Sequence, residues 1–216
     1  MLTSADPSPT RPVRILALSG SVRVGSLNLG LLRAARELAP PDVDVTIAEL
    51  ADLPLYNQDL EAAGDPAPVQ RLKAQVRAAD AVLIATPEHN GIIPALLANA
   101  LEWLSRPPRQ SVLRARPLAI MGASPGRGGT ARAQLVLRQV LEHAGPAVLE
   151  RALALPHAGA AFDAAGNLID PTIRASVQQL VAELAAAARG AAADATSAEH
   201  RRATLTSGHP QLTLAA

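Results

Sequence analysis

The chain has no cysteine among its 216 residues, and its charges nearly cancel. The missing cysteine excludes disulfides, thiolate nucleophiles, cysteine-ligated zinc and iron–sulfur clusters. Lys and Arg number 20 against 19 Asp and Glu, and a formal net charge of +1 creates no field that would gather nucleic acid or an anionic membrane. The sequence therefore predicts a protein that binds neither.

Long apolar runs are also missing. No run reaches the roughly 20 residues that a transmembrane helix needs. The first residues, MLTSADPSPTRP, contain an acid and three prolines and lack the apolar centre of a secretory signal. We expect a cytoplasmic protein. His143 and His157 have no partners at the spacing of metal ligands, so we predict no metal site.

The chain is long enough for one domain, and 49% of its residues are hydrophobic, which suffices for a core. We place this domain at residues 12–189. Residues 1–11 are expected to form a disordered N-terminal extension. Residues 190–216 are rich in Ala, Ser and Thr without a sustained period, and we expect a disordered tail there.

Short apolar segments alternate along the chain with segments whose apolar residues recur at helical spacing. The expected strands are Val13–Leu18, Val43–Ala48, Ala81–Thr86, Pro117–Met121 and a weaker one within Ala147–Leu155. The expected helices are Leu27–Leu38, Val69–Ala79, Pro94–Leu104, Ala131–His143 and Ile173–Ala188. This alternation predicts an α/β fold in which helices cover both faces of a five-stranded, doubly wound parallel sheet.

Three loops rich in glycine and polar residues follow the first, third and fourth strands. They read SGSVRVGSLN, PEHNG and GASPGRGGT. Because ligands of open parallel sheets bind outside the carboxyl ends of the strands, we expect these loops to meet at one site.

The first loop carries the hydroxyls of Ser21 and Ser26, together with Arg23 and Asn28, directly before a helix. A helix N-terminus with such neighbours suits a phosphate monoester, although a capped turn with a solvated arginine would look the same. Neither Gly-x-Gly-x-x-Gly nor a Walker loop is present, but Glu49 lies where a ribose-binding acid would follow the second strand. A low-molecular-weight phosphatase would need a cysteine in this loop.

The second loop suits the edge of a flat heterocycle. Pro87 stiffens it, Gly91 permits close approach of the backbone, and the backbone N–H and C=O groups from Glu88 to Asn90 could hydrogen-bond a ring. The alternative is that Glu88 and Asn90 form a local turn or bind a neighbouring loop.

The third loop offers Ser124, Arg127 and several glycines, among them Gly126. It again permits close approach of the backbone to a ligand. By itself it is equally typical of a flexible turn.

Together these stretches resemble the NADPH-dependent FMN reductase family, which includes bacterial chromate and quinone reductases and certain azoreductases. The resemblance covers about Val13 to Leu180. It is carried by GSVRVGSLN (20–28), LADLPLYNQDLE (50–61), PEHNGIIPALLANALEW (87–103) and GASPGRGGTARAQ (122–134).

The resemblance implies a flavodoxin-like three-layer sandwich with strand order 2-1-3-4-5 and a bound FMN. The FMN would take hydride from NADPH or NADH and pass electrons to a quinone, a flavin or a similar small-molecule acceptor. No catalytic side chain beyond the flavin is implied, and the family usually forms homodimers or homotetramers. The implied FMN-binding residues are Ser21, Arg23, Ser26, Asn28, Pro87, Glu88, His89, Asn90, Gly91, Ser124 and Gly126.

The chain departs from the family pattern in the second loop. His89 stands where the family commonly has Tyr, and Ile92 and Ala95 replace a Ser and a Gly. His89 could modulate flavin affinity, nicotinamide access or pH response, or it could simply face solvent. Two other functions therefore stay open, a flavodoxin-type electron carrier and a flavin-binding regulatory protein without turnover.

Overall fold

The computed structural model describes the backbone of residues 11–206 and the side chains of residues 11–197. The expected N-terminal extension therefore lies almost wholly outside the described residues, as does the end of the expected tail at 207–216.

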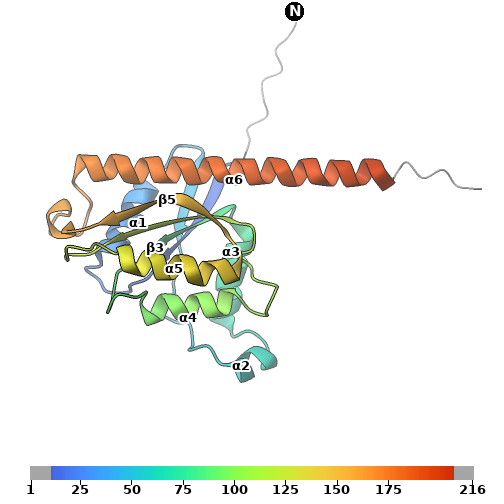
Figure 1. Cartoon of the computed structure of the whole chain (residues 1–216), viewed down its shortest axis with the longest axis horizontal. Coiled ribbons are helices and arrows are strands. Elements are labelled where there is room, and N and C mark those ends of the chain that lie inside the picture. Colours follow the sequence, from blue (N-terminus) through green and yellow to red (C-terminus); the bar gives the residue numbers. More distant parts are fainter. Residues whose placement is uncertain (1–10, 207–216) are drawn as a thin grey trace, which may run out of the picture.

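Five parallel strands form one sheet in the order β2-β1-β3-β4-β5, which confirms the predicted fold class (Figure 1). Each expected strand exists, with ends that move by at most a few residues. The bounds are β1 Val13–Ser19, β2 Val43–Ile47, β3 Ala81–Ala85, β4 Pro117–Ala123 and β5 Ala147–Leu155. The inner strands β3 and β4 are buried at every position, as their unbroken apolar sequences require.

Helices cover both faces of the sheet, so that the domain has three layers (Figure 1). The bounds are α1 Leu27–Glu37, α2 Gln58–Ala63, α3 Ala67–Ala78, α4 Ala95–Leu104, α5 Ala131–Ala144, the short 3-10 helix η1 Ala158–Ala161 and α6 Pro171–Thr206. Ser26 is the N-cap of α1, as predicted. Pro94 precedes α4 as its N-cap, whereas the sequence placed it at the first helical position. Neither α2 nor η1 was predicted.

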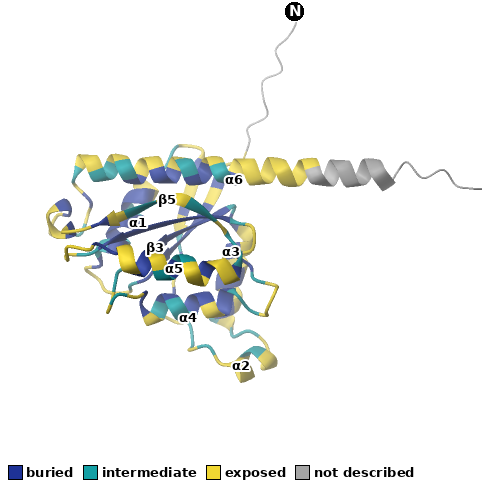
Figure 2. Cartoon of the chain, in the orientation of Figure 1, coloured by how far each residue is buried: buried dark blue, intermediate teal, exposed yellow. Residues whose placement is uncertain are grey.

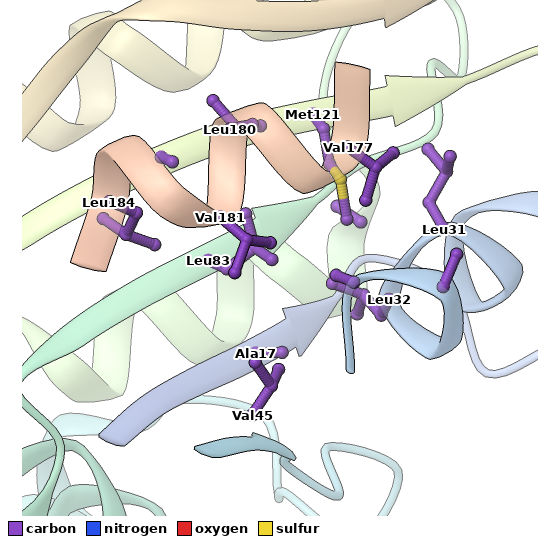
Figure 3. Packing of buried hydrophobic residues seen from close by; sticks show 14 of the residues in the cluster. Ala17, Leu31, Leu32, Val45, Leu83, Met121, Val177, Leu180, Val181 and Leu184 are labelled. Carbon is purple, nitrogen blue, oxygen red and sulfur yellow. The ribbon is translucent and has the colours of Figure 1, made fainter. Parts of the chain in front are cut away.

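The core is divided by the sheet into two apolar layers. In the first, Leu31 and Leu32 of α1 and Val177 to Leu184 of α6 pack on one face of the strands (Figure 3). In the second, residues of α3, α4 and α5 pack on the other face. The sheet is thus held from both sides, and only the strand ends and the loops after them remain free to bind a ligand.

Helix α6 is longer than the sequence predicted. It was expected to end at Ala188 and to be followed by a disordered tail, but it continues to Thr206. Its buried side chains end at Ala188, and the described residues beyond Gly190 are exposed as the helix extends past the rest of the domain (Figure 2). The physical reason is composition, because alanine has the highest helix propensity and is the commonest residue of this segment, which contains no proline. None of the described helices, α6 included, combines the length and apolar character that a membrane span requires.

A chain that ends at Gly190 should keep the stability of the full chain. The removed part of α6 contributes no described buried side chain, so we expect the free energy of unfolding to change by less than about 0.5 kcal/mol. Urea denaturation followed by circular dichroism measures this. A loss of several kcal/mol would mean that the projecting segment packs against another surface.

Candidate functional site

The ends of β1 and β3 mark the point where the strand order reverses, and the first two loops diverge from there. Ser19 pairs with Ala85 in the sheet, and the N–H of Gly20 donates to the Ala85 carbonyl at 2.8 Å. A Cβ atom on Gly20 would lie 2.9 Å from Cδ of Pro87. The glycine therefore lets the two loops approach each other closely at the place where an open sheet binds its ligands.

A cleft of about 310 Å³ opens between the three predicted loops. The predicted residues on its wall are Ser21, Arg23, Ser26, Asn28, Pro87, Glu88, His89 and Ser124. Asn90, Gly91 and Gly126 belong to the same loops but do not line it. Leu27, Ala123 and Pro125 also line the cleft, and their apolar side chains offer no polar pattern by which they could be predicted.

The first loop presents hydrogen-bond donors to one end of this cleft. Ser26 Oγ caps α1 by accepting the N–H of Leu29 at 3.2 Å. Helix geometry leaves the N–H groups of Leu27 and Asn28 without intrahelical acceptors. Arg23 is exposed, and among the described residues its guanidinium has no carboxylate partner. This end of the cleft is therefore positive and suited to a phosphate.

Asn28 connects the first loop to the third. Its side-chain amide donates to the Ala123 carbonyl at 2.9 Å, and its side-chain oxygen accepts the Ala123 N–H at 2.9 Å. Asn28 is 3% exposed, so both hydrogen bonds are shielded from water. Asn28 thus lines the cleft, and its side chain holds the end of β4 against the start of α1.

The second loop is a tight turn across His89–Ile92. The N–H of His89 donates to the Ile92 carbonyl and the N–H of Ile92 donates to the His89 carbonyl, at 3.1 and 3.0 Å. Asn90 and Gly91 both have positive φ, 52° and 78°, which is the pattern of a type I′ turn. The backbone groups of His89 are thus used within the turn, whereas the N–H groups of Glu88, Asn90 and Gly91 have no acceptor in the described part of the chain. The His89 side chain is exposed and lies on the wall of the cleft.

The Glu88 side chain binds a neighbouring loop, which was the alternative that the sequence left open. Its Oε2 accepts the backbone N–H groups of Arg132 and Ala133 at 3.1 and 3.2 Å. These N–H groups belong to the first turn of α5, where a carboxylate is favourable. The negative charge of Glu88 is therefore partly offset by a helix end, which weakens its repulsion of an anion in the cleft.

The third loop is held by the loop after β5. The N–H of Ala158 donates to the Ser124 carbonyl at 3.0 Å, and the N–H of His157 donates to the Gly126 carbonyl at 3.1 Å. Ser124 Oγ accepts the N–H of Gly126 at 3.0 Å. The loop that the sequence allowed to be flexible is therefore fixed by its own hydrogen bonds and by β5.

A larger cavity, of about 640 Å³, lies away from these loops between α2 and the segment after α4. Tyr56 on its wall packs edge-on against Trp103 and donates its hydroxyl to Glu61 at 2.7 Å, a hydrogen bond that raises the pKa of Tyr56. No carboxyl end of a strand borders this cavity. Size alone therefore does not identify the site, and the smaller cleft at the switch point is the better candidate.

The chemistry of the cleft fits FMN. One end offers Arg23 and the free N–H groups of α1 for a phosphate, and the other end offers the N–H group of Glu88 beside Pro87 and Pro125 for a flat ring. Glu88, the acidic residue that lines the cleft, is already bound by α5 through its carboxylate.

Comparisons with known proteins agree with this assignment. The family model of the NADPH-dependent FMN reductases matches residues 13–160. An NAD(P)H-dependent FMN reductase of Pseudomonas aeruginosa is 45% identical over 77% of this chain and 90% of its own length. A 2-hydroxy-1,4-benzoquinone reductase of a Burkholderia species is 37% identical over 81% of this chain and 95% of its own length.

Among solved structures, the flavoenzyme FerB of Paracoccus denitrificans, an NAD(P)H:acceptor oxidoreductase, superposes with a TM-score of 0.75 at 32% identity. The superposition covers 82% of this chain and 98% of FerB. The match of the family model, the identity to full-length relatives and the three loops at the switch point lead to one conclusion: the chain belongs to the NADPH-dependent FMN reductase family.

Proposed function

We propose that this protein is an FMN-dependent NAD(P)H oxidoreductase that delivers electrons to quinones or flavins. The observation that carries the proposal is the cleft at the switch point, where a phosphate site and a site for a flat ring adjoin. Bound FMN supplies the redox chemistry, accepting a hydride and releasing electrons to the acceptor.

The chain's own residues bind and orient the cofactor. Arg23, Ser21 and the start of α1 would hold the phosphate. The N–H groups of Glu88 and Asn90 would donate to the edge of the ring, where fixed donors stabilise negative charge. Asn28 and the Glu88 carboxylate would act indirectly, because their side-chain hydrogen bonds hold the three loops in position relative to one another.

Quinone-type acceptors follow from the relatives. The similar proteins include quinone reductases and a 2-hydroxy-1,4-benzoquinone reductase, and the cleft of this chain is open to solvent at His89. The cytoplasmic location stays a prediction of the sequence.

Replacing Arg23 with Ala should weaken FMN binding about 10- to 100-fold, because a charge-assisted hydrogen bond to the phosphate is lost. Riboflavin has the same ring system without the phosphate, and its affinity should not change. Fluorescence titration of the flavin-free protein with both compounds measures the difference. The phosphate assignment is wrong if Arg23→Ala lowers the affinities for FMN and riboflavin equally, or if it lowers neither affinity.

His89→Tyr should retain FMN and change the dependence of turnover on pH between roughly pH 5.5 and 8, because an imidazole on the wall of the cleft is replaced by a phenol. Steady-state rates across this range measure the effect. His143→Tyr is a matched control, since His143 lies on α5 outside the cleft. Identical pH profiles for wild type and His89→Tyr would show that His89 only faces solvent.

A homodimer or homotetramer is part of the proposal. It is supported by α2, which has no buried residue, and by Leu55 and Leu60 beside and within it, which are 80% and 40% exposed. Light scattering of the purified protein determines the oligomeric state.

A further inference from the structure

A second cleft, of about 360 Å³, adjoins the flavin cleft on the other side of the first loop. It lies between the carboxyl ends of β1 and β2. Ser21 lines both clefts, so that they adjoin at this residue. The volume is within the range of small-molecule sites.

The polar anchor of this second cleft is Glu49. It lies two residues after the end of β2, and its Oε1 accepts the backbone N–H of Ala51 at 3.0 Å. Its Oε2 has no partner in the part of the chain that the structure describes, and no other lining residue carries a charge. A carboxylate at the end of the second strand of an α/β sheet is placed to accept both hydroxyls of a ribose.

The rest of the wall mixes polar groups with apolar side chains. Val22 stands beside Ser21 and is 57% exposed, although a β-branched apolar side chain gains nothing from water. Ile47 lies at the end of β2, and Leu50 follows it in the next loop. Apolar side chains beside one carboxylate suit a flat base attached to a ribose.

We propose that this second cleft binds the adenosine half of a dinucleotide, with Glu49 accepting the ribose hydroxyls and Val22 packing on the adenine. The proposal rests on the proposed function, because the other half of the dinucleotide would lie over the flavin cleft. A 2′-phosphate would meet the Glu49 charge, so the site favours NADH over NADPH. The same adenosine chemistry belongs to FAD, and the experiments separate these two sources.

Glu49→Gln keeps the shape and the acceptor for the Ala51 N–H but removes the charge. For the flavin-loaded enzyme we expect the KM for NADH to rise about tenfold, because a hydrogen bond to a charged group is lost, with kcat unchanged. The KM for NADPH should stay constant or fall, since repulsion of the 2′-phosphate is relieved. Glu142→Gln, an exposed acid on α5 outside both clefts, is the matched control and should change neither KM.

A binding measurement without turnover makes the test independent of activity. Isothermal titration of the flavin-loaded protein with adenosine 5′-monophosphate should show binding that Glu49→Gln weakens about tenfold and Glu142→Gln leaves intact. Titration of the flavin-free protein with FMN and FAD identifies the source. Glu49→Gln could weaken the binding of FAD, leave the binding of FMN intact and leave the KM for NADH unchanged. In that case the cleft binds the adenosine of a flavin.

The proposal is overturned if Glu49→Gln alters neither nucleotide KM, nor the affinity for adenosine 5′-monophosphate, nor that for FAD. Failure of the proposed function would look different. In that case neither NADH nor NADPH would reduce the bound flavin in wild type, whereas binding of adenosine 5′-monophosphate would still report on Glu49.

Discussion

Asn28→Ala is expected to lower the free energy of unfolding by about 2–6 kcal/mol, because it leaves the buried N–H and C=O of Ala123 without partners at a cost of about 1–3 kcal/mol each. It should also weaken FMN retention, since the start of α1 and the end of β4 would no longer be joined beside the cleft. Urea denaturation and the flavin content of the purified protein measure the two effects.

Asn57→Ala is the matched control for this substitution. Asn57 also accepts a backbone N–H, that of Asp59 at 2.7 Å, but it is exposed and caps only α2. We expect a loss of about 1 kcal/mol or less. Equal losses for Asn28→Ala and Asn57→Ala would show that the buried pair of hydrogen bonds is not important for the fold.

Gly122→Ala should be at least as damaging. A Cβ atom on Gly122 would lie 2.2 Å from Thr130 Oγ1 and 2.3 Å from the Thr86 backbone oxygen, and neither can move without displacing β3 or the start of α5. We expect a loss of about 3 kcal/mol or more, at the upper end of the cost of overpacking. The midpoint of thermal unfolding, measured by circular dichroism, reports it.

Gly128→Ala, in the same loop, is its control. A Cβ atom on Gly128 would have no heavy atom within 4 Å. Its effect on the free energy of unfolding should be within about 0.5 kcal/mol of zero. A similar loss for both substitutions would mean that the loop is strained as a whole and that Gly122 has no special contact.

The sheet could be predicted because the burial of its strands is visible in their apolar sequences. Runs such as AVLIA at 81–85 are buried on both faces, and a strand in a parallel sheet covered by helices must be apolar throughout. Helix α2 was missed for the opposite reason. Its sequence QDLEAA has no apolar face, and the structure buries none of its residues.

The sequence predicted which loops form the site, but it did not predict the hydrogen bonds that hold these loops together. Loop positions follow from strand order, so that the three loops meet as expected. The hydrogen-bond partners of the Asn28 and Glu88 side chains are backbone groups 95 and 44 residues away. No local sequence pattern predicts hydrogen bonds across such separations. The end of α6 was misjudged because an alanine-rich segment without a period was read as disorder, although alanine favours a helix even without a partner.

The cleft at the switch point is expected to hold an FMN that a nicotinamide nucleotide reduces. The most direct measurement is the visible spectrum of the purified protein reconstituted with FMN, recorded anaerobically during addition of NADH and then NADPH. The oxidised-flavin bands should bleach rapidly with at least one of them and return when a benzoquinone is added. Retention of FMN with no bleaching by either nucleotide would contradict the oxidoreductase function.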